Sequence, residues 1–221
     1  MCTLCLWSYF YPTERSVHVE KLADDLKQPD LELLICIFLA VRIDLNSVAF
    51  DKPISVFSSA IATFYAPSDK CGPGGMRSER IRATPVWRNG EGRYDCVFIK
   101  DPSSSTTSIT LCGLHVARVH TFFSFTYRNV LYQLALIHDF EFVGKEPDED
   151  TGMWIVRRLR HPRARIVSLD AIYHAAHLIP VYYGEGAVPR TLTAEHSLDH
   201  YHFFYVNKFI DHHAFEIARK Y

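Results

Sequence analysis

The chain has 221 residues, of which 48% are hydrophobic and 22% are charged, so it can bury a sizeable core and has an ordinary globular composition. Its formal net charge of -1 at pH 7 creates no global field that attracts nucleic acid, and such binding would depend on a local basic patch. The longest apolar run, residues 33–41, is too short to span a bilayer, and residues 1–7 lack the pattern of a secretory signal, so we expect an intracellular protein without membrane association.

The N-terminal part of the chain, residues 1–50, is expected to be a divergent helical segment, and residues 51–221 a β-rich domain. Asp30 follows Pro29 and can cap a helix over residues 31–42. This helix is apolar on nearly every side, so it must pack against something. A domain outside this chain is one candidate for that surface.

Cysteines give little indication of a metal or redox site. Cys2 and Cys5 form a CxxC pair, but no second ligand pair follows at zinc-finger spacing. Cys96 and Cys112 stand in apolar strand contexts, where thiols are inert. We therefore expect free thiols, no disulfide framework and no cofactor.

Residues 54–65 carry apolar side chains at helical spacing, at Phe57, Ala60, Ile61 and Phe64, which predicts a second helix. A glycine-rich loop over residues 68–75 follows. Because it lacks the lysine-hydroxyl pair of a phosphate-binding loop, a structural turn is the better interpretation.

Beyond residue 93 the pattern is typical of strands. A polar loop is expected at residues 101–108 and a tight turn at Arg128 and Asn129. The expected strands are residues 94–100, 115–127, 130–143, 153–159 and 165–172, with the last two forming a second hairpin. A final helix or loop would close the domain. These elements predict an α+β fold with a central, mostly antiparallel sheet, and a small, partly open barrel is an alternative form of it.

Several segments have a residue order too particular to be generic. They read FYAPSDKCGPGGMRSERIR from Phe64, RYDCVFI from Arg93, EPDEDTGMWIV from Glu146, HAAHLIPV from His174 and FYVNKFIDHHAFEI from Phe204. Together they resemble the C-terminal region of proteins encoded by fungal Plavaka-type DNA transposons, relatives of the CACTA and Kyakuja-Dileera-Zisupton groups. The resemblance covers residues 50–218.

The resemblance implies a transposase-like parent protein whose strand-transfer chemistry lies upstream, in a nuclease domain that this chain lacks. It therefore implies a non-catalytic accessory region in the nucleus, which contacts DNA or chromatin or docks on a transposase core. The chain also departs from its relatives, since Asp139 stands where they tend to have a large aromatic residue. Such drift is what a domesticated element or a relic without activity would show.

Arginines supply the best candidates for DNA contact. They are Arg157, Arg158, Arg160, Arg163 and Arg165, without an acidic residue among them. At the tip of the second hairpin these guanidinium groups would bind phosphates with little reading of bases. A second basic stretch over residues 77–93 lies near Trp87 and Tyr94, which could stack on bases, but a solvated face is the favoured interpretation of it.

Acidic residues and histidines suggest alternatives. The acidic loop at residues 146–150 is expected to pair with the basic hairpin. His200 and His202 would share one face if they lay on a strand, where they could chelate a metal. The resemblance instead implies structural roles for His177, His212 and His213, and we predict no metal site. A metal-dependent hydrolase remains an alternative.

An interaction module is a further alternative. The helix at residues 31–42 could pair with a transposase core or with a second copy of the chain. Polar substitution of Ile35 and Leu39 would then abolish the association.

Overall fold

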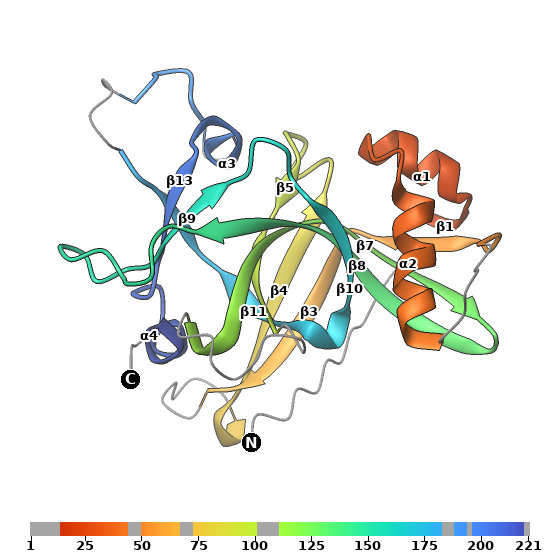
Figure 1. The fold of residues 1–221 in the computed structure, drawn as a ribbon, viewed down its shortest axis with the longest axis horizontal. Coiled ribbons are helices and arrows are strands. Elements are labelled where there is room, and N and C mark those ends of the chain that lie inside the picture. Colours follow the sequence, from red (N-terminus) through yellow and green to blue (C-terminus); the bar gives the residue numbers. More distant parts are fainter. Residues whose placement is uncertain are drawn as a thin grey trace.

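A computed structural model describes residues 14–43, 50–66, 73–100, 111–182, 188–193 and 196–218. The fold is α+β, with a large sheet, a separate three-stranded sheet and few helices (Figure 1). Every strand pair in the described part of the chain is antiparallel. The predicted fold class is confirmed, and the large sheet does not close into a barrel.

The centre of the large sheet is the hairpin of β7 (Leu114–Tyr127) and β8 (Val130–Phe142). Arg128 and Asn129 join the strands with φ angles of 50° and 63°, the left-handed conformation of a tight hairpin turn. The predicted turn is therefore confirmed. A register shift between Val119 and Thr121 bends the hairpin, so that each long strand has different neighbours along its two halves.

Because of this bend, different strands lie beside the two halves of β7. On the free edge of β7, β6 (Cys96–Lys100) pairs with the first half and β2 (Ile54–Phe57) with the second. The β1 strand (Glu14–Val17) then pairs with β2, and β11 (Ile172–Ala176) with β6. At the far end of the sheet, β13 (Phe203–Val206) lies between β9 and β12 (Leu178–Pro180).

The predicted second hairpin is wrong. Both β9 (Ile155–Arg158) and β10 (Ala164–Ser168) pair with the same edge of β8, at residues 140–142 and 134–138 respectively. They run one after the other in the same direction, so residues 159–163 loop out between them, opposite Asp139. Pro162 in this loop has no N–H group to donate to a sheet ladder, which favours the interruption.

The predicted helix over residues 54–65 is also wrong, because this segment forms β2 and β3 (Ser59–Tyr65). Ala60, Ala62 and Phe64 are buried at every second position, which is the period of a strand. β3 pairs with β4 (Met76–Thr84), and β4 with β5 (Arg93–Tyr94). Between β3 and β4, Gly74 and Gly75 have φ angles of 63° and 76°, as expected for a structural turn; residues 67–72 lie outside the described part.

The main core lies between the two sheets. Phe64 and Ile81 of the small sheet pack with Val97, Phe122 and Ile137 of the large sheet, and each is at most 1% exposed. A second core group under β9 and β13 contains Trp154, Phe204 and residues of the C-terminal helix. Along β6, Val97 and Ile99 belong to the first group and Cys96 and Phe98 to the second, so the two groups lie on opposite faces of this strand.

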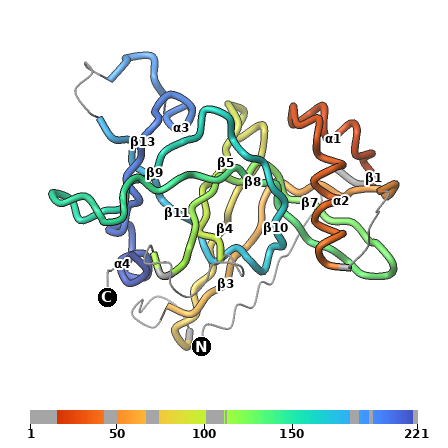
Figure 2. Tube along the Cα trace, in the orientation of Figure 1, coloured from red at the N-terminus to blue at the C-terminus, as the bar shows by residue number. Residues whose placement is uncertain are grey.

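The N-terminal helices are α1 (Val19–Leu26) and α2 (Leu31–Ile43), and they lie at one end of the molecule (Figure 2). The predicted helix over residues 31–42 is thus confirmed. Leu31, Ile35 and Leu39 are fully buried in a group that includes sheet residues such as Phe123 and Leu136. The chain's own sheet therefore covers the buried face of this helix.

The C-terminal elements are the short α3 (Ser197–His200) and α4 (His212–Ala218). Single 3-10 turns occur at Pro73–Gly75, Leu111–Gly113 and Leu169–Ala171. Within the described ranges, no helix has the length and apolar character needed to cross a membrane. The expected polar loop at residues 101–108 and the Cys2–Cys5 pair lie outside the described residues.

Candidate nucleic-acid interface

Two neighbouring pockets share the side chain of Arg118, on β7. The first has a volume of about 520 Å³ and the second about 540 Å³. Five arginines line the two pockets, against three aspartates. The arginines are Arg88, Arg93, Arg118, Arg158 and Arg160, and the aspartates are Asp95, Asp139 and Asp199. We call these two pockets together the arginine cleft.

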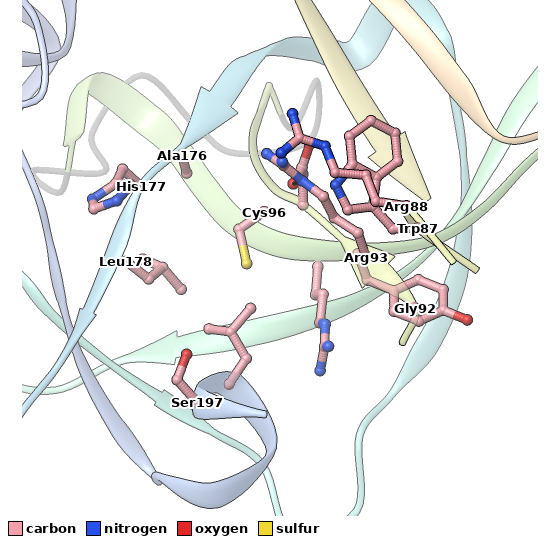
Figure 3. Close-up of a pocket in the computed structure, with 13 residues that line it drawn as sticks. Trp87, Arg88, Gly92, Arg93, Cys96, Ala176, His177, Leu178 and Ser197 are labelled. Carbon is pink, nitrogen blue, oxygen red and sulfur yellow. Dashed lines mark hydrogen bonds and ion pairs between the residues drawn. The ribbon is translucent and has the colours of Figure 1, made fainter. Parts of the chain in front are cut away.

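The first pocket lies between the β4–β5 connection and the β11–β12 segment. Figure 3 shows Trp87, Arg88 and Arg93 on one side of the pocket and Ala176 and Leu178 on the other. Cys96 lines it from β6, and burial raises the pKa of this thiol to about 12. The thiol is therefore protonated at neutral pH and is a poor nucleophile, as expected from its strand context.

The second pocket lies beside Asp139, the position of β8 between those that pair with β9 and with β10. Its walls include His138 and Asp139 of β8, Arg158 of β9, and Arg160 and Pro162 of the looped-out residues 159–163. The interruption between β9 and β10 thus creates one wall of the pocket. A continuous strand at this edge would have paired with β8 instead.

Arg118 forms the boundary between the pockets. It is only 9% exposed, and its guanidinium donates to both carboxylate oxygens of Asp199 over 2.6 and 3.2 Å. The same guanidinium lies 5.5 Å from the ring centre of Tyr94, and its Nε atom is buried without a hydrogen-bond partner. A guanidinium held by a carboxylate on one side and an aromatic ring on the other keeps a fixed position.

Aromatic rings continue from Arg118 into the second pocket. Tyr94 stacks on His120 at 5.7 Å between ring centres, and His120 lies 3.8 Å from His138. Burial, followed by the charges of His138 and Arg118, lowers the pKa of His120 to about 3. The pKa of His138 is lowered as well, chiefly by burial and then by Arg118. Both imidazoles are neutral at pH 7 and act as aromatic surface beside the cationic arginines.

The five arginines predicted for DNA contact fall into two groups. Arg157 binds Glu141 at 2.6 Å, Arg165 binds both carboxylate oxygens of Asp139 at 2.6 and 2.9 Å, and Arg158 lies 3.6 Å from Asp199. Arg160 and Arg163 are exposed, and within the described part of the chain no carboxylate pairs with either. The arginines lie on two strands that pair with β8 one after the other, and in the loop between them, so their predicted position at a hairpin tip is wrong.

Carboxylates near these arginines are not the predicted ones. Glu141, Asp139 and Asp199 pair with Arg157, Arg165 and Arg158, whereas Asp148 of the acidic loop accepts hydrogen bonds from Thr151. These hydrogen bonds lower the pKa of Asp148. Asp139, which stands where the resembled proteins tend to have a large aromatic residue, is partly exposed and paired with Arg165, so it leaves no unpaired buried charge.

The second basic stretch, for which a solvated face was favoured, gathers around one aromatic ring. The guanidinium carbons of Arg82, Arg88 and Arg93 lie 4.5, 5.5 and 5.6 Å from the ring centre of Trp87. Sequence reasoning did not identify Arg118 as a site residue. The sequence signal for Arg118 is a lone arginine within an apolar strand, where burying a charge costs free energy unless the charge is paired.

The histidines do not assemble a metal site in the described part of the chain, where no group of three or more His, Cys, Asp or Glu side chains could hold an ion. His200 ends α3 and His202 follows it, so the two do not share a strand face as the chelation alternative requires. His213 is buried, stacks on Phe64 at 5.0 Å and contacts the Tyr173 hydroxyl at 2.9 Å.

Comparison of the chain with known protein families, with curated proteins and with solved structures gives no match.

Proposed function

We propose that this protein binds the phosphate backbone of a nucleic acid along the arginine cleft and the looped-out residues 159–163. The observation that carries this proposal is the position of Arg118. It joins a pocket lined by Arg88 and Arg93 to a pocket lined by Arg158 and Arg160, so two basic stretches distant in sequence form one continuous surface.

Charge at this surface favours an anionic ligand. Arg88, Arg160 and Arg163 are exposed, and no carboxylate in the described ranges pairs with them. The planar guanidinium group matches the oxygen geometry of a phosphate, and the release of counterions from a nucleic acid adds to the binding free energy. Because the whole chain carries a net charge of -1, this local excess is the source of the attraction.

Contacts of this kind position a nucleic acid without reading its sequence. Such a role agrees with the resemblance to the C-terminal region of Plavaka-type transposon proteins. In that context we propose a non-catalytic accessory region, which contacts DNA or chromatin in the nucleus while another domain carries out the strand-transfer chemistry.

The test removes charge without breaking an ion pair. A triple variant, Arg88→Gln, Arg160→Gln and Arg163→Gln, is compared with the wild type for binding to a short labelled DNA duplex by fluorescence anisotropy. The expected result is a loss of affinity of about tenfold or more at low salt. Equal affinity of the triple variant and the wild type would contradict the proposal.

The matched control removes three exposed basic groups at the opposite end of the molecule. Lys27 directly follows α1, Arg42 is in the last turn of α2, and Arg128 is in the β7–β8 turn. Figure 1 shows these elements at the end of the molecule away from β9 and α3. Replacement of the three residues by Gln changes the net charge by the same amount. If the control variant loses as much affinity as the cleft variant, binding depends on overall charge and not on this surface.

A second candidate function is protein–protein interaction through α2. Leu33, Ile37 and Val41 are 58%, 51% and 82% exposed and occur at every fourth position, which places them on one face of the helix. A paired copy or a transposase core would cover this apolar stripe. Light scattering over a concentration series tests it: Ile37→Lys should abolish any concentration-dependent increase in mass, and a constant monomer mass for the wild type would exclude self-association.

A further inference from the structure

A third pocket lies on the other side of Trp87 from the arginine cleft. It has a volume of about 360 Å³. Its polar lining consists of two arginines and three hydroxyl residues, and no carboxylate is among the lining residues. They are Arg80, Arg82, Ser58, Ser59 and Thr84, with Val86 and Trp87 at the rim.

The register of the small sheet places the two arginines on one face. Arg80 and Arg82 stand two positions apart on β4, on either side of the buried Ile81, so their side chains leave the sheet on the side away from the core. Ser59 pairs with Arg82 in the ladder, and its hydroxyl accepts a hydrogen bond of 3.1 Å from Arg80. The hydroxyl thus holds one guanidinium beside the other.

Arg82 is held in place beside the pocket. Its guanidinium carbon lies 4.5 Å from the ring centre of Trp87, and its Nη1 donates to the Arg80 carbonyl at 3.5 Å. The nearest acidic residue, Asp95, is already occupied, since one oxygen accepts from the Arg82 backbone N–H at 2.8 Å and the other from the Arg93 side chain at 2.8 Å. Burial, and then the neighbouring charge of Arg93, lower the pKa of Arg82, as expected where cations gather without enough anions.

Trp87 separates this pocket from the arginine cleft, because its side chain lines both. The backbone fixes its position: Trp87 N–H donates to the Glu91 carbonyl at 3.1 Å, and Gly90 N–H donates to the Trp87 carbonyl at 2.9 Å. Arg88 and Asn89 complete this turn with φ angles of 52° and 61°. A partly exposed indole at the tip of a tight hairpin is a rigid surface with little entropy to lose on stacking.

We propose that the pocket between β3 and β4 binds a phosphate group of a single-stranded nucleic acid, and that Trp87 stacks on the unpaired base beside it. This inference rests on the proposed nucleic-acid binding and specifies the form of the ligand. Two guanidiniums and the hydroxyls of Ser58 and Ser59 supply donors for phosphate oxygens, with no lining carboxylate to repel them. The Thr84 hydroxyl donates to the Val86 carbonyl at 2.9 Å. In a duplex the faces of the bases are stacked inside the helix, whereas in a single strand a base can rest on an aromatic ring.

The test uses the full chain and three probes: a single-stranded oligothymidine, a duplex of the same length, and thymidine monophosphate. Binding is measured by anisotropy and by quenching of tryptophan emission. Trp87→Leu should weaken binding of the single strand by about tenfold and lower the ratio of single-strand to duplex affinity, and Trp87→Phe should restore most of the loss. Some loss of duplex affinity is expected as well, because Trp87 also lines the arginine cleft. All proteins carry Trp7→Phe, so the only other tryptophan is the buried Trp154, and the quenching should be absent in Trp87→Leu.

Arg80→Gln provides a second variant, since it alters an exposed side chain of the same pocket without changing the indole. It should also weaken binding of the single strand. Equal loss of single-strand and duplex affinity in Trp87→Leu, or no loss in either variant, overturns the single-strand inference while nucleic-acid binding stands. Competition by thymidine monophosphate at the same nucleotide concentration overturns it in favour of a free nucleotide. If the wild type binds neither strand form, both proposals fail.

Discussion

Arg118 on β7 and Asp199 on α3 form a two-point ion pair between residues 81 positions apart in the sequence. The arginine side chain is 10% exposed and the aspartate side chain 54% exposed, so the carboxylate forms the solvent-facing half of the pair. The same carboxylate lies 3.6 Å from Arg158. Asp199 therefore occupies, in the free protein, a position from which a phosphate could interact with two arginines of the cleft.

We predict that Asp199→Asn increases affinity for nucleic acid several-fold. The change removes a negative charge from the cleft and frees charge on Arg118 and Arg158 for phosphate. The slope of log affinity against log salt should become steeper by about one unit. Anisotropy titrations at several salt concentrations measure both quantities, and a weaker or unchanged affinity would show that the pair does not face the ligand.

The paired and unpaired arginines near β9 and β10 should behave differently. Arg165 is bound at two points by the half-exposed Asp139, so Arg165→Gln should lower the free energy of unfolding by about 1 kcal/mol and change DNA affinity little. Arg163→Gln should instead lower DNA affinity and change the free energy of unfolding little, because its exposed side chain has no carboxylate partner in the described structure. Urea denaturation and anisotropy on both variants test this; the same pattern in both would refute it.

Acid should destabilise the protein through its buried histidines. The pKa of His120 is about 3 in the folded protein and near 6.5 when exposed, so between these values only the unfolded chain takes up the proton. The contribution of His120 to the free energy of unfolding is therefore fully present above about pH 6.5 and decreases as the pH is lowered towards 3. His174, with a pKa lowered to about 4 by burial and then by His213, acts in the same direction. Glu79, whose pKa burial raises, acts in the opposite direction, because its contribution is lost as pH rises through its folded pKa.

His120→Phe isolates this effect. The phenyl ring can keep the stack between Tyr94 and His138 and leaves no unpaired ring nitrogen. Between about pH 7.5 and pH 5 the variant should lose about 2 kcal/mol less unfolding free energy than the wild type. Urea denaturation at the two pH values provides the measurement. An identical loss in both proteins would mean that His120 does not titrate as its burial requires.

The two faces of α2 should differ in their effect on stability. Ile35 is fully buried, so Ile35→Ala should cost about 2–5 kcal/mol. Ile37 is 51% exposed, and Ile37→Ala should change stability by about 0.5 kcal/mol or less. Polar substitution of Ile35 and Leu39 would therefore report on folding and not on self-association. Equal denaturation midpoints for the two alanine variants would contradict this assignment of the faces.

The β7–β8 hairpin and α2 could be predicted because their signals are local. Long apolar runs flank Arg128 and Asn129, and asparagine tolerates the left-handed conformation that the turn needs. Similarly, Pro29 and Asp30 mark the start of α2 ahead of a long apolar segment. In such elements the sequence pattern and the tertiary fold favour the same structure.

The errors arose where distant contacts decide the structure. Ala60 and Phe64 fit both a helical spacing and, with Ala62, a strand spacing, and pairing with β4 selects the strand. Two strand-like segments around residues 159–163 fit a hairpin or two successive partners of one strand equally well, and pairing with β8 selects the second. The cleft itself depends on Arg118 meeting Asp199 across 81 residues, which no local pattern specifies.

The salt dependence of binding tests the central claim most directly. The affinity of the wild-type chain for a short DNA duplex is measured across a salt series, together with that of the Arg88→Gln, Arg160→Gln, Arg163→Gln variant. Three arginine–phosphate contacts contribute about -2.7 to the slope of log affinity against log salt for the wild type, and the variant should lose this contribution and have a much shallower slope. A wild-type slope near zero, or equal slopes for the two proteins, would contradict the assignment of the arginine cleft as a phosphate-binding surface.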